Sequence, residues 1–137
     1  MPSDRAASSL AVILIGLFYA LVGIVFAWPV EHARAWRLAA WVVSAVAYAA
    51  HIGYEHFRLH NRPPRAALHV ALAVALGAFG LAVGANLHSL SVPSTAGHRR
   101  LLLIALAAWP AITAVPAFLV ALALATILSR ARLGIVK

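Results

Sequence analysis

The residues whose types and spacing best suit chemistry in this 137-residue sequence fall on one stripe of an otherwise apolar segment. Successive members of the stripe are alternately four and three residues apart, and they are Arg37, Trp41, Ser44, Tyr48, His51, Glu55, Arg58 and Arg62. This spacing places all of them on one face of an α-helix. Because lipid cannot satisfy polar groups, we expect this stripe, the polar seam, to face protein or water.

His51 and Glu55 are the pair best suited to chemistry within the seam. They are four residues apart, so their side chains can touch on a helix. His69 enters the following apolar segment at a similar depth, and an antiparallel hairpin would bring it to the same pair. Tyr48 lies one turn deeper. We therefore predict a ligand or proton site formed by Tyr48, His51, Glu55 and His69.

The composition of this site leaves its chemistry open. A histidine beside a carboxylate can relay a proton or hold a cation. Two histidines and one glutamate are also a set of metal ligands, which makes His51, Glu55 and His69 candidates for a metal centre. The structural alternative is a packing seam in which Glu55 pairs with His51 or Arg58 and the polar contacts set the helix register. The cofactor, if any, is unknown at this level.

Four apolar runs organise the chain, at residues 9–30, 36–57, 66–89 and 101–128. At about 1.5 Å per residue, each is long enough to cross about 30 Å of hydrocarbon. The chain is 64% hydrophobic, more than a soluble domain of this size could bury. We therefore expect an all-α integral membrane protein. Its short connections favour an up-down four-helix transmembrane bundle, in one domain over residues 1–137.

The prolines near and within the apolar runs have two expected roles. Four of them mark expected helix ends, and these are Pro29, Pro63, Pro64 and Pro93. Pro110 and Pro116 fall inside the fourth run, where we expect a kink and not an end, because neighbouring helices can satisfy the freed carbonyl groups.

The basic residues indicate an orientation. The formal net charge is +8, yet no basic stripe with interleaved aromatic residues exists outside the apolar runs, so we expect no nucleic-acid partner. The side with both termini and the middle connection carries more Arg and Lys than the other side, which predicts cytoplasmic termini in a bacterial-type inner membrane. Arg58, Arg62 and Arg65 would contact anionic headgroups there. Trp28 and Trp36 would lie at the outer interface.

A weak internal similarity relates the two halves of the chain. Residues 16–23 resemble residues 77–84, and residues 38–41 resemble residues 106–109, in the same order and at similar spacing. Duplication of a two-helix hairpin and chance similarity in a sequence rich in Ala and Leu both account for this pattern. His51 and Glu55 have no counterpart in the second half.

Small residues also line faces of the first and third runs. The third-run face holds His69, Ala73, Gly77, Gly80, Gly84 and His88, and we expect it to lie opposite the polar seam. Gly16, Ala20, Gly23 and Ala27 form a similar face on the first run, where self-association is one alternative to packing within the chain.

The function expected from these features is non-enzymatic. The sequence contains no nucleophile-elbow, phosphate-loop or zinc-protease motif, and no cysteine that could form a disulfide or a thiolate metal site. The leading expectation is a small membrane protein that acts through helix contacts, as a subunit of a larger assembly or as a self-associating bundle. The alternative is a proton-coupled small-solute carrier, or a ligand-, metal- or haem-binding protein, using His51, Glu55 and His69.

Overall fold

The computed structural model describes residues 2–27, 31–91 and 95–135, with side chains for 6–27, 31–91 and 95–131, and within these ranges the regular secondary structure is all α-helix. The four helices are α1 (Pro2–Ala27), α2 (Ala33–Phe57), α3 (Pro63–Leu90) and α4 (Ala96–Ile135). Each contains a stretch long and apolar enough to cross a membrane. The predicted helical class and the four membrane-length helices are therefore confirmed.

Local sequence explains where these helices begin and end. Arg62 is extended, with φ −62° and ψ 147°, because the residue before a proline avoids the helical region. Pro63 and Pro64 then occupy the first turn of α3, where a proline loses no hydrogen bond. Pro110 and Pro116 lie within α4, which continues through both. Pro29, Pro93 and Trp28 lie outside the described residues.

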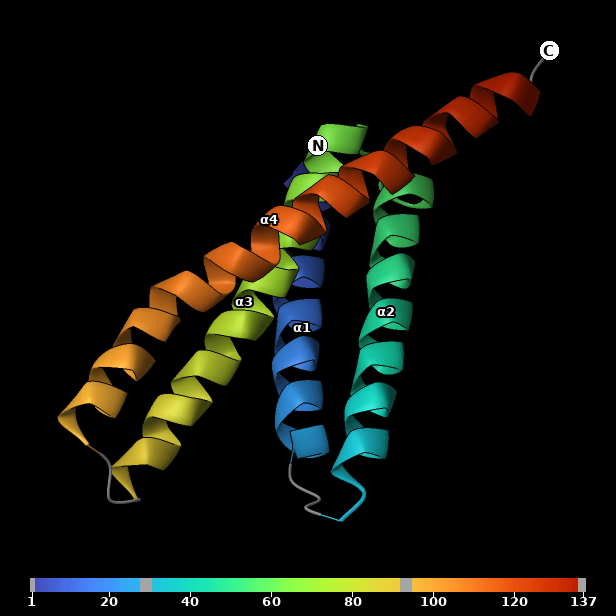
Figure 1. Cartoon of the computed structure of the whole chain (residues 1–137). Helices are drawn as coiled ribbons and strands as arrows, with labels where there is room; N and C mark the ends of the chain where they lie inside the picture. Colours follow the sequence, from blue (N-terminus) through green and yellow to red (C-terminus); the bar gives the residue numbers. More distant parts are fainter. Residues whose placement is uncertain (1, 28–30, 92–94, 136–137) are drawn as a thin grey trace.

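Helix α3 is the centre of the molecule. It buries 44% of its most apolar stretch, against 11% for the corresponding stretch of each other helix. Its main neighbours are α4 and α1, whereas α2 rests mostly on α1 and meets α3 and α4 less extensively. In Figure 1 the C-terminal end of α1 and the N-terminal end of α2 lie together at the bottom, while α4 crosses α3 obliquely.

Glycines allow α1 and α3 to approach closely. A Cβ atom added at Gly77 would lie 2.5 Å from the Cβ of Tyr19 and 3.2 Å from the carbonyl oxygen of Gly16. One added at Gly80 would lie 2.8 Å from the Cβ of Ala20. Gly77 and Gly80 of the small face of α3 therefore pack against α1, whereas the sequence predicted that this face would lie opposite the polar seam of α2. Gly77 also lines a pocket with Ser44 and Tyr48 of the seam. Two small-residue faces fit one another more closely than either fits a seam with Trp and Tyr.

Helices α2, α3 and α4 meet at the end of the molecule that holds His51 and Glu55. The apolar core there consists of Ile52, Ala67, Val70, Ala121 and Ala125. Elsewhere, large apolar side chains of α1, α2 and α4 point outward, including Leu17, Val46 and Ile112, which are each more than half exposed. A surface of this kind suits a lipid environment better than water.

Candidate functional site

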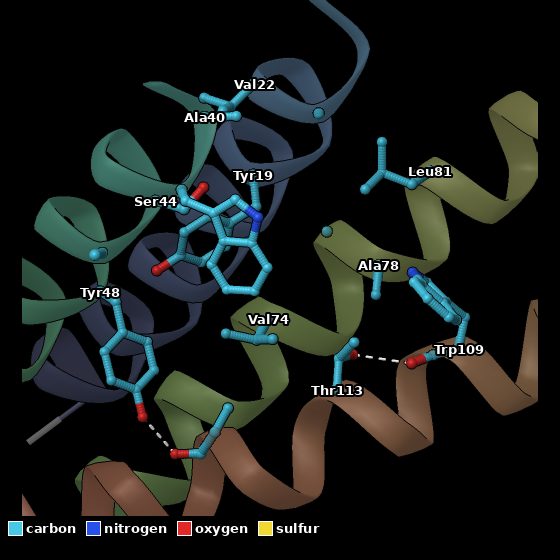
Figure 2. Close-up of a pocket in the computed structure, with 15 residues that line it drawn as sticks. Tyr19, Val22, Ala40, Ser44, Tyr48, Val74, Ala78, Leu81, Trp109 and Thr113 are labelled. Atoms are coloured by element: carbon cyan, nitrogen blue, oxygen red, sulfur yellow. Dashed lines mark hydrogen bonds between the residues drawn. The ribbon is translucent and has the colours of Figure 1, made fainter. Parts of the chain in front are cut away.

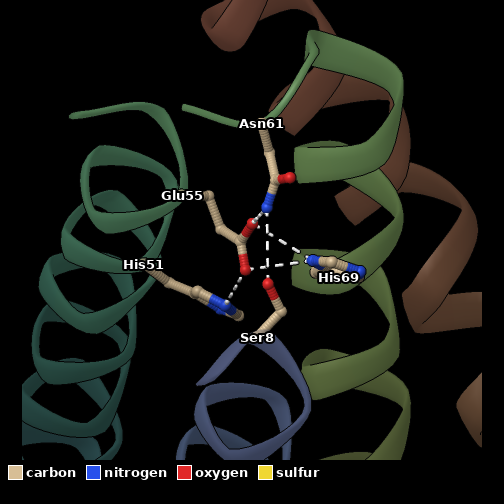
Figure 3. Close-up of polar contacts among 5 residues, drawn as sticks. All are labelled: Ser8, His51, Glu55, Asn61 and His69. Atoms are coloured by element: carbon tan, nitrogen blue, oxygen red, sulfur yellow. Dashed lines mark hydrogen bonds and ion pairs between the residues drawn. The ribbon is translucent and has the colours of Figure 1, made fainter. Parts of the chain in front are cut away.

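A buried carboxylate lies at the centre of the candidate site. The side chain of Glu55 on α2 is 0% exposed. Its Oε2 atom accepts a hydrogen bond of 2.5 Å from Nδ2 of Asn61, and Nδ1 of His69 on α3 lies 3.1 Å from both carboxylate oxygens (Figure 3). The group therefore has hydrogen-bonding partners inside the protein in place of water, as a buried charge requires.

Asn61 reaches Glu55 because the chain turns sharply after α2. His60 adopts a left-handed conformation with φ 52°, and the backbone N–H of Asn61 then donates to the carbonyl oxygen of Glu55 at 3.1 Å. This turn directs the Asn61 amide back toward α2, where its Nδ2 atom also lies 3.4 Å from the hydroxyl of Ser8 on α1. Asn61 and Ser8 were not predicted as site residues. The position of Asn61 in a short connection before two prolines is the one signal that marked it as a turn residue.

His51 is the least satisfied member of the cluster. Its side chain is 0% exposed, and its Nε2 atom lies 3.7 Å from Oε1 of Glu55, which is close enough for an ion pair but too far for a hydrogen bond. Neither ring nitrogen of His51 has a hydrogen-bond partner among the residues that the structure describes. Buried polar atoms are nearly always paired, so His51 has unused capacity to donate or accept a proton beside the carboxylate.

Together Ser8, His51, Glu55, Asn61 and His69 form what we call the carboxylate cluster (Figure 3). It draws side chains from α1, α2, α3 and the α2–α3 connection. Tyr48, the fourth predicted site residue, lies apart from it, because its hydroxyl donates to the carbonyl oxygen of Ala117 on α4. Tyr48 instead lines a pocket between the four helices, one helical turn from His51.

The polar seam is buried along part of its length. His51 and Glu55 are fully buried, but Arg37 is exposed and Trp41 is 76% exposed. Arg62 lies beyond the end of α2 at Phe57. The seam therefore faces the protein interior at His51 and Glu55 and not in its N-terminal half, because α2 touches α3 and α4 mainly near its C-terminal end.

Arginines border the cluster without entering it. Arg58, Arg62 and Arg65 are all exposed at the end of the molecule where α2 stops and α3 begins. Glu55 forms its ion pairs with His51 and His69, and not with Arg58 as one interpretation of the sequence allowed. The exposed guanidinium groups remain available to headgroups or water.

The geometry of the cluster favours proton sharing over metal binding. Within the described ranges, no group of three or more His, Asp or Glu side chains is arranged to hold a metal ion. A hydrogen-bonded carboxylate with two imidazoles can instead hold and pass a proton without rearrangement.

The chain matches no known protein family, no curated protein and no solved structure.

Proposed function

We propose that the chain is an integral membrane protein whose helices cross a bilayer in alternating directions, forming an up-down bundle with both termini cytoplasmic. The support is the outward-facing apolar surface of α1, α2 and α4, together with the exposed arginines at the α2–α3 end. A phosphatase reporter fused after Lys137 in a bacterial host should be inactive, and a fluorescent reporter at the same point should be bright. Periplasmic phosphatase activity would contradict this orientation.

Within the membrane, we infer that the protein is a proton-linked carrier or binding protein for a small solute. The observation that supports this most is the burial of Glu55 beside His51, whose ring nitrogens form no hydrogen bond within the described part of the chain. Glu55 contacts His51 from α2, Asn61 from the connection and His69 from α3, and Asn61 in turn contacts Ser8 from α1. A change in the charge of Glu55 therefore alters contacts on three helices at once.

A change in the charge of Glu55 would in this way affect the pocket that begins one helical turn away, at Tyr48. When Glu55 is charged, its contacts with Asn61 and His69 fasten α2 to α3 and, through Ser8, to α1. Protonation weakens charge-assisted hydrogen bonds, so the end of α2 becomes free to shift against its neighbours. Access to the pocket would then depend on pH, as carriers with buried carboxylates require.

The test uses thiol labelling, because the natural chain has no cysteine. Ser44→Cys places one thiol in the pocket, and Ser91→Cys places one at the exposed end of α3. In lipid vesicles, the labelling rate of Ser44→Cys with N-ethylmaleimide, divided by that of Ser91→Cys, should change with pH. Each rate is first divided by the thiolate fraction of that cysteine, measured by ultraviolet absorbance at the same pH, because a thiol in an apolar pocket ionises at higher pH than an exposed one.

Two further substitutions test whether Glu55 causes the pH dependence of the labelling ratio. Adding Glu55→Gln should abolish the pH dependence of the labelling ratio, whereas Glu31→Gln, which changes an exposed carboxylate, should preserve it. A ratio that is independent of pH in the parent protein, or one that responds to pH equally in both backgrounds, would contradict a proton-linked function.

A second candidate function is that of a subunit or self-associating bundle. It is favoured by the exposed N-terminal half of the polar seam, where Arg37 is exposed and Trp41 is 76% exposed. A partner helix would bury the Trp41 ring and satisfy Arg37. Native mass spectrometry of the protein extracted from its membrane should then detect a stoichiometric complex that Trp41→Ala disrupts. A monomer in both forms would contradict this candidate.

A further inference from the structure

A pocket of about 420 Å³ lies between the four helices, beside the carboxylate cluster but separate from it (Figure 2). Each helix contributes to its wall, with Tyr19 from α1, Ser44 and Tyr48 from α2, Val74 from α3 and Thr113 from α4 among the lining residues. This volume falls in the range of small-molecule sites, and the lining is mainly apolar with a few polar groups, as in such sites generally.

The Tyr19 hydroxyl is the distinctive polar group of this pocket. The hydroxyl of Tyr48 donates to the carbonyl oxygen of Ala117, and that of Thr113 donates to the carbonyl oxygen of Trp109 at 2.9 Å, so both are satisfied within the protein. The Tyr19 oxygen is buried and has no hydrogen-bond partner among the described residues. Because a phenol is a good donor and buried donors are rarely left unpaired, a ligand acceptor fits this position.

The rest of the lining restricts the kind of ligand. None of the residues that line the pocket is Asp, Glu, Lys, Arg or His, so a charged ligand would be buried without a counter-charge. The indoles of Trp41 on α2 and Trp109 on α4 also line it, and they are 76% and 50% exposed. They therefore flank an opening between α2 and α4, on a surface that faces lipid in the proposed membrane arrangement.

We propose that this pocket binds a neutral, flat, membrane-soluble molecule that bears a carbonyl oxygen, such as a quinone, and that the Tyr19 hydroxyl donates a hydrogen bond to that oxygen. The Trp41 and Trp109 rings contact the faces or edges of the ligand, which enters laterally from the bilayer. The inference extends the proposed function by naming the class of solute, and it rests on the proposed insertion of the helices in lipid.

The test compares the binding of two probes, one with carbonyl groups and one without. Menadione is a methylated naphthoquinone, and methylnaphthalene has the same carbon skeleton without the carbonyl oxygens. Each radiolabelled compound is dialysed to equilibrium against the full chain in lipid nanodiscs, and partition into empty nanodiscs is subtracted. We expect saturable binding of menadione, and weaker binding of methylnaphthalene.

Three variants assign the binding to the pocket. Tyr19→Phe removes an unpaired hydroxyl, so the fold is retained, and it should weaken menadione binding roughly tenfold while leaving methylnaphthalene unchanged. Ser44→Phe fills the pocket and should abolish binding of both probes. Val46→Phe places the same ring on an exposed position of α2 that does not line the pocket, and it should bind both probes as the parent protein does.

The outcomes separate this inference from the proton-linked function. Equal affinities for the two probes, or a Tyr19→Phe variant that binds menadione as tightly as the parent, would mean that the pocket accepts apolar material without recognising a carbonyl, and would overturn the inference. Absence of saturable binding would overturn it as well. Equilibrium dialysis measures probe binding in the pocket, whereas the thiol-labelling ratio with Glu55→Gln measures the effect of the carboxylate cluster. Either the inference or the proton-linked function can therefore be contradicted without the other.

Discussion

Nδ1 of His69 lies 3.1 Å from both carboxylate oxygens of Glu55, which joins α3 to α2 inside the protein. Replacing His69 with Ala leaves a buried carboxylate with one fewer donor, and we expect the free energy of unfolding to fall by about 1–3 kcal/mol. Chemical denaturation in detergent micelles measures the change. His88→Ala is the matched control, because His88 is an exposed histidine on the same helix, far from the carboxylate cluster. Equal stability of the two variants would show that the His69 contact contributes nothing.

Asn61 offers a test of the charge on Glu55. Asn61→Ala removes the 2.5 Å hydrogen bond to Oε2 of Glu55 and should cost about 1.5–3 kcal/mol. Asn61→Asp instead places a second carboxylate against the first, so it should cost more than Asn61→Ala at neutral pH.

The pH dependence of Asn61→Asp has a defined sign. Lowering the pH until one of the two carboxylates is protonated removes the repulsion, so the stability difference from the parent protein should shrink on acidification and grow as the pH rises. Unfolding curves over a pH series give this difference. A penalty that does not vary with pH would indicate that Glu55 carries no charge at neutral pH.

The contact between α1 and α3 depends on glycine. Gly77→Ala should lower the free energy of unfolding by about 1–3 kcal/mol, because the added methyl group meets the Cβ of Tyr19 and the backbone of Gly16. Gly84→Ala is the control on the same helix, since a Cβ added there meets nothing within 4 Å. That variant should gain up to about 1 kcal/mol from its higher helix propensity. If both variants behaved alike, the close approach of α1 to α3 would be wrong.

Asn86 joins α3 to α4 near the opposite end from Glu55. Its Nδ2 atom donates to the carbonyl oxygens of Ala82 on its own helix and Leu102 on α4, each at 2.8 Å. Asn86→Ala should cost about 0.6–1.7 kcal/mol, the range measured for hydrogen bonds between membrane helices. Ser91→Ala provides the comparison, because the Ser91 hydroxyl is exposed and bonds to His88 of the same helix. No difference between the two would contradict a stabilising role for the link to α4.

The helices and the meeting of His51, Glu55 and His69 follow from local features of the sequence. Long apolar runs bounded by prolines and arginines predict the four helices, and the spacing of His51 and Glu55 predicts a shared face. His69 joins them because the connection between α2 and α3 is short, which makes the two helix ends neighbours.

The remaining features depend on contacts between distant segments. Ser8 reaches the cluster because α1 packs on α3, and that choice reflects the fit between Gly16 and Gly77 over the whole interface. Asn61 points at Glu55 because His60 adopts a left-handed backbone conformation, which residue type alone does not require. Exposure of Trp41 results from the limited contact of α2 with α3 and α4, and no periodicity in α2 encodes it.

The central claim is that Glu55 exchanges a proton inside the protein, and infrared spectroscopy of the carboxyl group tests it most directly. The chain has three acidic side chains, so the carbonyl stretch of a protonated carboxyl can be assigned by substitution. In lipid nanodiscs, a pH titration should show one carboxyl band that exchanges slowly with heavy water, is displaced in His69→Ala, is retained in Glu31→Gln and is absent in Glu55→Gln. A titration in which the parent protein and Glu55→Gln give the same bands at every pH would contradict the claim.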